Sequence, residues 1–314
     1  MNADLAGKTA VVTGAGNGLG RAEALGLAAC GANLVLNDLP GPAVQAVAGQ
    51  IGDRAVVVAG DVSEWPTGEL IRSAAIEKFG GLDIVVNNAG VLRDRMVFTM
   101  SADEWDTVLK VHLRGHFVTT RLATEYWRQR SKQSGGPVYG RIINTSSEAF
   151  LLGSAGQPNY AAAKAGIVAL TVATARSCAR YGVRANAICP RARTDMTAAL
   201  MGQAPEGQVD PLAPEYVAPL VSYLASPAAE PINGEVFVVH GGVAAIMEPP
   251  KLRTVFQAAD HGSPDGMWTF DSIAAALGPE FAGPGRGRGT GGERPAGFAC
   301  EATLPLASET IGFS

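Results

Sequence analysis

The sequence predicts an α/β protein: a Rossmann-type, doubly wound parallel sheet of seven strands with helices on both faces. Short apolar runs alternate with longer helical runs along most of the chain, and this alternation requires a parallel sheet with right-handed crossovers. A glycine-rich turn, from Thr13 to Gly20, joins the first apolar run to the first helical run. The chain of 314 residues is 47% hydrophobic and contains 39 glycines, which suits a large core with tight turns.

The first half of the chain supplies four of the predicted strands, at residues 9–12, 33–37, 55–59 and 83–86. Each is an apolar run of the length expected for a buried parallel strand. A helix is expected after the first strand as far as Gly31, and another from Pro66 to Phe79. A capping-box pattern, Ser101-Ala102-Asp103-Glu104, begins a further helix that we expect to continue to about Arg130.

The second half supplies the remaining three strands, at residues 141–143, 184–188 and 235–239. Helices are expected from Pro158 to about residue 180 and from Glu215 to Leu224. Residues 194–213 have the composition of a loop, which we expect to close over a substrate. We therefore expect residues 1–248 to form one α/β domain that includes this loop.

Residues 249–314 are expected to form an irregular C-terminal extension, because the strand–helix alternation ends at Pro249-Pro250. One short helix is expected at residues 267–274. The segment from Gly283 to Gly297 holds seven glycines and three arginines, a composition that cannot bury a core. We expect this part to be flexible or weakly held, and to serve as a lid or an intersubunit arm.

The glycine-rich turn is typical of a phosphate-binding site. A strand before it and a helix after it give the context that such a turn requires. Glycines let the backbone approach a pyrophosphate, and unpaired N–H groups at the helix N-terminus bind the anion. The residues expected to bind a dinucleotide here are Gly14, Asn17, Gly18, Leu19 and Gly20.

An acidic residue at the end of the second strand indicates which dinucleotide binds. Asp38 lies 18 residues after Gly20, where a carboxylate can bind a ribose diol and repel a 2′-phosphate. This spacing favours NAD or NADH over NADP; the alternative is that Asp38 only begins the turn before Pro40-Gly41. After the third strand, Asp61 and Val62 are expected beside the adenine, although Asp61 could equally be an N-cap residue.

The chemistry is expected at Ser147, Tyr160 and Lys164. Tyr160 and Lys164 are four residues apart, so they share one face of the predicted helix. A phenol with a pKa of about 10 is a poor acid–base catalyst at neutral pH, and a neighbouring cation lowers that pKa. Ser147, at the mouth of the preceding loop, can hold a substrate oxygen while Tyr160 exchanges the proton. Taken alone, Tyr160 and Lys164 could also be a solvated pair on a helix surface.

With these residues placed, the chain resembles the short-chain dehydrogenase/reductase family over about residues 5–247. The resemblance depends on motifs that occur in order and at the family's spacing: Thr13-Gly14-x3-Gly18-x-Gly20, Asn87-Asn88-Ala89-Gly90, Ser147 and Tyr160-x3-Lys164. It implies that Tyr160 is the general acid–base, that Lys164 lowers the pKa of Tyr160, and that Ser147 binds the substrate oxygen.

The same resemblance implies further contacts with the cofactor. Lys164 would hold the nicotinamide ribose, so that both Tyr160 and Lys164 belong to the cofactor site as well. The other residues implied to contact the cofactor are Asn88, Ala89, Gly90 and Thr194.

Other motifs resemble one branch of this family, the (3R)-hydroxyacyl-CoA dehydrogenase part of the peroxisomal multifunctional β-oxidation enzyme, and a set of actinobacterial reductases. Among them are Val35-Leu36-Asn37-Asp38-Leu39, Val111-His112-Leu113-Arg114-Gly115 and Pro190-Arg191-Ala192-Arg193-Thr194. This resemblance implies an NAD(H)-dependent oxidoreductase of secondary alcohols and ketones, with a 3-hydroxyacyl thioester as substrate. The alternatives are an NADPH-dependent 3-oxoacyl reductase, a steroid or terpenoid alcohol dehydrogenase, and a non-catalytic dinucleotide-binding protein.

Two positions depart from the family pattern. His112 stands where most members have an Asn that holds a relay water, although the branch resembled above also carries His. Two roles for His112 are open: a substituted member of the catalytic proton relay, and a buried helical side chain that only packs. Arg191 follows Pro190 where most members have Gly, and Arg191 and Arg193 either meet a phosphate or carboxylate of the substrate or lie in solvent.

The composition argues against several other classes of protein. The net charge is −4 without a basic block, which excludes nucleic acid and anionic membranes as expected partners, and no run of 18 apolar residues spans a membrane. Four scattered cysteines and an N-terminus without an apolar leader indicate a cytoplasmic protein with reduced thiols and no metal. We expect a small-molecule substrate and a homodimer or homotetramer, because helices 101–130 and 158–180 are rich in small or apolar residues and the family is commonly oligomeric.

Overall fold

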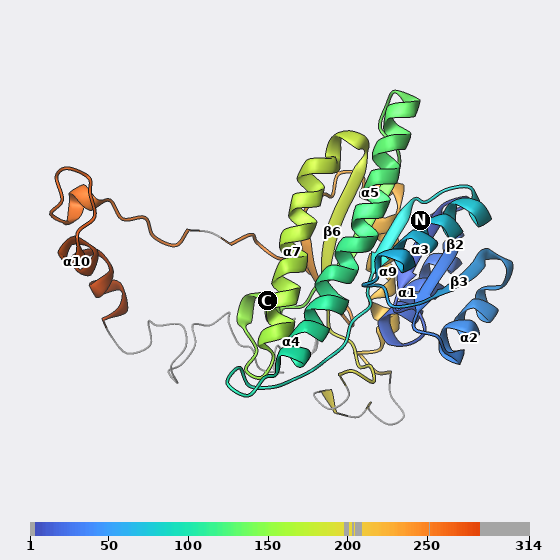
Figure 1. Ribbon diagram of the computed structural model, residues 1–314, viewed down its shortest axis with the longest axis horizontal. Helices are drawn as coiled ribbons and strands as arrows, with labels where there is room; N and C mark the ends of the chain where they lie inside the picture. The colour runs from blue at the N-terminus through green and yellow to red at the C-terminus, as the bar shows by residue number, and fades with distance from the viewer. Residues whose placement is uncertain (1–3, 198–200, 203, 205–208, 251, 283–314) are drawn as a thin grey trace, which may run out of the picture. The chain divides into compact units, whose positions relative to one another are not determined.

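A computed structural model describes residues 4–197, 201, 202, 204, 209–250 and 252–282. Its main feature is an eight-stranded sheet with the strand order β3-β2-β1-β4-β5-β6-β7-β8 (Figure 1). The strands are β1 Thr9–Thr13, β2 Asn33–Asp38, β3 Ala55–Ala59, β4 Ile84–Asn87, β5 Gly140–Thr145, β6 Val183–Pro190, β7 Val236–His240 and β8 Val243–Ile246. Strands β1 to β7 pair in parallel, as the sequence predicts.

The eighth strand was not expected. It pairs antiparallel with β7, with His240 opposite Val243, so that the predicted seven-stranded parallel sheet gains one antiparallel edge strand. Gly241 and Gly242 form the two-residue turn between them, and Gly241 has a φ of +47°, a conformation that glycine adopts without strain. A Gly-Gly pair between two apolar runs is a hairpin signal from which this strand could have been predicted.

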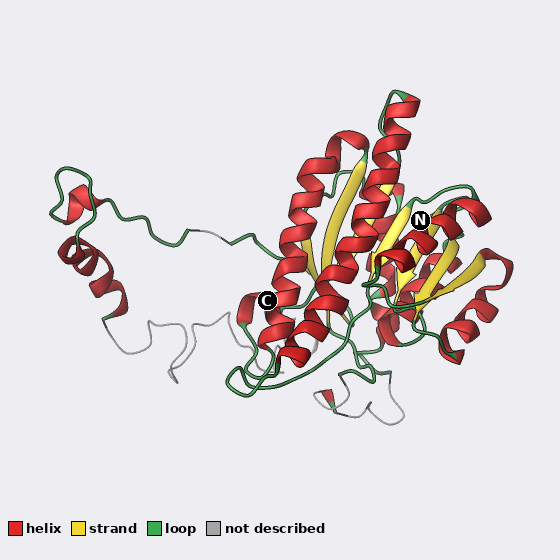
Figure 2. Ribbon diagram, in the orientation of Figure 1, coloured by secondary structure: helices red, strands yellow, loops and turns green. Residues whose placement is uncertain are grey.

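Helices cover both faces of the sheet, which Figure 2 shows as red ribbons on either side of yellow strands. Helix α1 (Gly18–Ala29) contacts both α2 (Pro42–Ile51) and α9 (Ala218–Ala225), and the three form one layer. Helices α3 (Trp65–Phe79), α5 (Gly115–Ser134) and α7 (Pro158–Cys178) form the other layer. The side chains of β1 alternate between the two cores: Ala10 and Val12 pack with the first layer, and Val11 packs with the second.

The helix predicted at residues 101–130 is interrupted. Helix α4 (Ala102–Leu109) starts at the predicted capping box, in which Glu104 N donates to Ser101 Oγ at 3.2 Å. A π-helical turn, Lys110–Arg114, then separates α4 from α5. Such turns widen a helix by one residue and often occur at functional sites, and this one carries His112.

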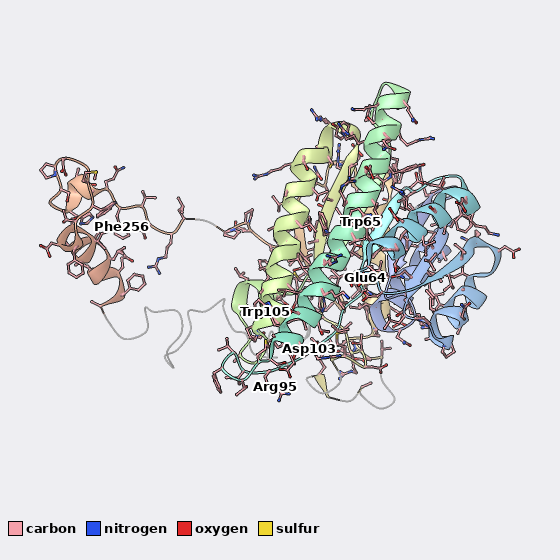
Figure 3. All side chains as sticks on the ribbon, viewed as in Figure 1. Glu64, Trp65, Arg95, Asp103, Trp105 and Phe256 are labelled. Carbon is pink, nitrogen blue, oxygen red and sulfur yellow. The ribbon has the colours of Figure 1, made fainter. Side chains whose placement is uncertain are left out.

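The described chain divides into two compact units at Met247 and Glu248. The second unit contains helix α10 (Phe270–Phe281), which is longer than the short helix expected at 267–274, and the labelled Phe256 of Figure 3, whose ring lies 5.8 Å from that of His261. The expectation for Gly283 to Gly297 falls outside the described residues. Among those described, no helix combines the length and apolar character needed to cross a membrane.

Candidate active site

The turn between β1 and α1 requires glycine, because its backbone packs closely against neighbouring backbone atoms and has positive φ angles. Gly14 and Gly18 have φ values of +65° and +50°, which disfavour other residues. A Cβ on Gly14 would lie 2.9 Å from Ala89 Cα, and one on Gly20 would overlap Gly14 O. Asn17, the N-cap residue of α1, makes no side-chain capping bond, so the first N–H groups of α1 remain available to an anion.

The end of β4 holds this turn in place. Thr13 Oγ1 accepts hydrogen bonds from Asn88 N at 3.0 Å and from Ala89 N at 3.1 Å. The Asn88 side chain donates from Nδ2 to Thr13 O at 3.1 Å and to Gly14 O at 3.3 Å. Asn88 and Ala89 were predicted as cofactor contacts; the structure shows that Asn88 also fixes the backbone of the phosphate-binding turn.

Asp38 lies beside the glycine turn at the carboxyl end of β2. Its carboxylate accepts hydrogen bonds from Gly16 N at 2.8 Å and from Leu39 N at 2.7 Å. A carboxylate that faces the phosphate-binding turn is positioned for a ribose diol, and it also orders the turn that follows β2. The residues present therefore fit a dinucleotide, on the basis of the glycine cradle and this carboxylate.

Asp61 is engaged within the chain. Its Oδ1 accepts hydrogen bonds from Ser63 N at 2.9 Å and from Ser63 Oγ at 2.6 Å, and its Oδ2 lies 3.5 Å from Lys110 Nζ. These contacts correspond to the turn-capping alternative, although the N-cap residue of α3 is Glu64. Val62 is buried and packs against the start of α5, where a Cβ on Gly115 would lie 2.8 Å from Val62 Cγ1.

Tyr160 and Lys164 lie on the first two turns of α7 and meet the end of β5, after which Ser147 follows. Lys164 Nζ lies 5.3 Å from the centroid of the Tyr160 ring and donates to Thr145 O at 2.6 Å. Ser147 is close enough to the Tyr160 phenol to lower its pKa. The three side chains predicted to carry the chemistry are therefore brought together, beside the glycine turn at the carboxyl edge of the sheet.

The electrostatics of this trio differ from the sequence expectation. Burial raises the pKa of Tyr160 to about 12, and the nearby Ser147 side chain only partly opposes this effect. Burial also lowers the pKa of Lys164 to about 7. Because desolvation disfavours both charged forms, the chain by itself holds a neutral phenol beside an amine that titrates near neutral pH. Lys164 is not among the groups that lower the Tyr160 pKa in this structure.

His112 packs against Tyr160. Its ring stands edge-on to that of Tyr160, with centroids 5.3 Å apart at 89°. His112 Nε2 lies 3.0 Å from Val91 N and 2.8 Å from Val91 O, so it bonds one of the two according to its tautomer. Burial lowers the pKa of His112 well below its usual value. The ring is therefore neutral, and Nδ1 is buried without a partner among the described residues.

Several residues have positioning roles that the sequence did not predict. Asn87 Nδ2 donates to Asn144 Oδ1 at 2.9 Å, and Asn144 Nδ2 donates to Thr171 Oγ1 at 2.9 Å, which ties β4, β5 and α7 together inside the core. Asn159 Nδ2 donates to Arg93 O and Glu104 O, both at 3.0 Å, and so fixes the first turn of α7. Polar residues at the ends of otherwise apolar strands are the signal that could have identified Asn87 and Asn144.

The loop before α7 is joined to the start of α4. Arg95 N donates to Gly156 O at 2.7 Å, and Arg95 Nη2 lies 2.9 Å from Glu104 Oε1; Arg95 is labelled with Trp105 of α4 in Figure 3. Gln157 Nε2 donates to Asp94 Oδ2 at 2.9 Å. These contacts order the segment that leads into Tyr160.

Thr194 and the two arginines before it lie in the segment that leaves β6. A Cβ on Gly18 would lie 3.0 Å from Thr194 Cγ2, so Thr194 reaches the glycine turn. Arg191 pairs with Glu148 at 2.6 Å, and Arg193 pairs with Asp210 at 2.9 Å. Neither expectation for these arginines holds: both are bound to carboxylates of the chain itself, because the fold brings Glu148 and Asp210 next to them.

Comparisons with known proteins identify the family of the chain. The family model for short chain dehydrogenases matches residues 8–204. The chain is 53% identical over 293 residues to the hydroxyacyl-CoA dehydrogenase ChsB1 of Mycobacterium tuberculosis, covering 89% of this chain and 90% of that protein. It is 40% identical to the mouse peroxisomal multifunctional enzyme type 2 over 75% of this chain, but spans only 32% of that protein. A short chain dehydrogenase from Mycobacterium avium has a similar solved structure, with a TM-score of 0.76, 42% identity, and coverage of 89% of this chain and 94% of that one.

Proposed function

The chain belongs to the short-chain dehydrogenase family and is an oxidoreductase that acts on CH–OH groups; we propose that it interconverts a 3-hydroxyacyl thioester and its ketone with NAD(H). The observation that carries this proposal is the convergence of Ser147, Tyr160 and Lys164 beside the glycine turn. The names of two relatives, a hydroxyacyl-CoA dehydrogenase and a peroxisomal multifunctional enzyme, support the thioester.

We propose that the dinucleotide is held by the turn from Gly14 to Gly20, with Asp38 at the adenosine ribose. The N–H groups of the first turn of α1 would bind the pyrophosphate. The Asp38 carboxylate accepts hydrogen bonds from a ribose diol and repels a 2′-phosphate, which supports NAD over NADP. When bound, the nicotinamide ring supplies or accepts the hydride.

Residues of the chain would transfer the proton to and from the substrate oxygen. Tyr160, a neutral phenol, would donate its proton to the substrate oxygen in ketone reduction, while Ser147 orients that oxygen. In alcohol oxidation Tyr160 must accept a proton, and a protonated Lys164 would stabilise the phenolate that does so. The Lys164 pKa of about 7 lets this amine carry or release a proton near neutral pH.

The chemical test compares cofactors, substrates and one variant. Purified protein would be assayed with NAD⁺ and NADP⁺ against 3-hydroxyacyl-CoA, steroid and terpenoid alcohols. We expect turnover of the thioester with NAD⁺, and we expect Tyr160→Phe to abolish turnover while NADH binding, followed by fluorescence titration, stays within about twofold. Retained turnover in Tyr160→Phe would refute the role of the phenol, and preference for a steroid would refute the thioester.

A further inference from the structure

A partly buried ion pair joins the turn that carries Ser147 to the segment that leaves β6. The Arg191 guanidinium donates two hydrogen bonds to the Glu148 carboxylate, from Nε to Oε2 at 2.6 Å and from Nη2 to Oε1 at 2.8 Å. The exposed fractions of the two side chains are only 21% and 20%. A two-point pair of this kind fixes orientation as well as distance, and burial makes it stronger than a surface pair.

Glu148 is the next residue after Ser147, and the short turn that holds both is well bonded. Ser147 Oγ accepts a hydrogen bond from Ala149 N at 3.2 Å, and Ser147 O accepts one from Phe150 N at 3.1 Å. Because the turn is internally tied, an anchor on Glu148 restrains the whole turn, including the Ser147 hydroxyl.

Arg191 is fixed at the other end of the pair. Its N–H donates to Val239 O on β7 at 3.0 Å, so the arginine stands on the sheet itself. Three residues later, Thr194 contacts the glycine turn at Gly18. The ion pair therefore connects the serine turn to the segment that reaches the dinucleotide side of the site.

We propose that Glu148 and Arg191 are positioning residues that hold Ser147 in register with the cofactor side of the site. The proposal rests on the proposed role of Ser147 in binding the substrate oxygen. Arg191 is a poor candidate for a substrate anion, since its Nε and Nη2 already donate to Glu148. A displacement of the serine hydroxyl by a fraction of an ångström weakens orientation of the reacting oxygen, and misplacements near 1 Å lower rates by about 100-fold.

Two other ion pairs of the chain serve as comparisons. Arg193 and Asp210 are similarly buried, with exposed fractions of 16% and 17%, but they close the base of the loop at residues 194–213 without reaching the serine turn. Arg141, which is 2% exposed, pairs with Glu230 at 2.7 Å at the start of β5, the strand end opposite Ser147. Glu230 is 53% exposed and also pairs with Arg184. Glu230→Gln therefore weakens the ion pairs of two arginines away from the chemistry, and it serves as the control for a purely structural loss.

The experiment measures four variants and one control in the full-length protein. The variants are Glu148→Gln, Arg191→Met, Arg191→Lys and the Glu148→Gln/Arg191→Met double variant, and the control is Glu230→Gln. The alcohol that the wild-type protein oxidises fastest is the substrate, and hydride transfer is followed in single turnovers so that product release does not mask it. NADH affinity and unfolding midpoints are measured alongside. We expect each single variant that breaks the pair to lower the transfer rate about 10- to 100-fold, with NADH affinity changed by less than about twofold.

A positioning role predicts a distinctive pattern among the variants. The double variant should lose no more activity than the worse single variant, because the two residues act as a unit, and Arg191→Lys should recover part of the rate through one remaining hydrogen bond. Glu230→Gln should lower the unfolding midpoint without changing the transfer rate. Additive losses in the double variant, or an unchanged transfer rate in Glu148→Gln and Arg191→Met, would overturn the proposal.

The results distinguish a failure of the positioning proposal from a failure of the proposed function. If Tyr160→Phe is inactive while Glu148→Gln transfers hydride normally, only the positioning pair is refuted. If Tyr160→Phe retains turnover, the proposed chemistry fails regardless of how the Glu148 and Arg191 variants behave.

Discussion

A methyl group added at Gly90 should overlap the ring of His112, and the distances in the structure indicate how much stability this overlap costs. A Cβ on Gly90 would lie 3.0 Å from both His112 Nδ1 and Nε2, and closer still to Cε1. The ring cannot easily yield: it is 1% exposed, bonded to the Val91 backbone through Nε2, and edge-on to Tyr160. Gly90 has no positive φ, so the contact alone decides the outcome.

We expect Gly90→Ala to destabilise the fold by about 1–2.5 kcal/mol. Overpacking costs about 1–3 kcal/mol, and because the His112 ring is held on several sides we take the upper part of this range, about 2–3 kcal/mol. The lower entropy of the unfolded chain returns about 0.5–1 kcal/mol. Gly49, inside α2 with nothing within 4 Å of its added Cβ, is the matched control, and Gly49→Ala should stabilise by up to about 1 kcal/mol. The hydride-transfer rate of Gly90→Ala should also fall, because the displaced ring presses on Tyr160.

The assay is urea unfolding at one protein concentration, combined with a double-mutant cycle. In a His112→Ala background the ring is gone, so the Gly90→Ala penalty should disappear. If Gly90→Ala is as stable as the wild-type protein, or its cost is the same with and without the imidazole, then the contact with His112 does not explain the need for glycine at this position.

Two further predictions concern charged groups. Asp38→Ala should raise the affinity for NADPH relative to NADH by about 10-fold, because a carboxylate beside a 2′-phosphate is repulsive; fluorescence titration with both dinucleotides measures this, and an unchanged preference would contradict the ribose role. Burial raises the pKa of Glu23 from 4.5 to about 8, so the unfolded chain releases this proton first and stability falls as pH rises between these values. Glu23→Met should therefore stabilise the fold by about 2–4 kcal/mol at pH 8 and much less near pH 5, and equal gains at both values in thermal unfolding would disprove the sign.

The sequence predicted the fold class and the parallel strands because their signals are local. Apolar runs of strand length, the glycine turn and the Tyr160-x3-Lys164 spacing each depend on residues within one or two turns of each other. The eighth strand was not predicted, although the Gly241-Gly242 pair is a local signal for a hairpin. The continuous helix predicted at 101–130 was wrong at its centre, because the π-helical turn around His112 is stabilised by contacts with Val91 and Tyr160, which are distant in sequence.

Long-range contacts also determine the ion-pair partners of Arg191 and Arg193, in the segment that leaves β6. Arg191 and Arg193 looked like substrate contacts or solvent-exposed groups, since nothing nearby in the sequence is paired with them. Their partners are 43 and 17 residues away, and only the folded chain brings these carboxylates within reach.

By itself, the sequence determined the class of sheet and the glycine turn, and it is the source of the hypothesis for the three candidate catalytic side chains, since glycine conformation and helical spacing follow from neighbouring residues. Only the tertiary structure decided the ionisation of those side chains. Burial by distant segments raises the pKa of Tyr160 and lowers that of Lys164, which reverses the expectation for an isolated phenol beside an ammonium group. Desolvation depends on everything packed around a group, and no local pattern of residues records it.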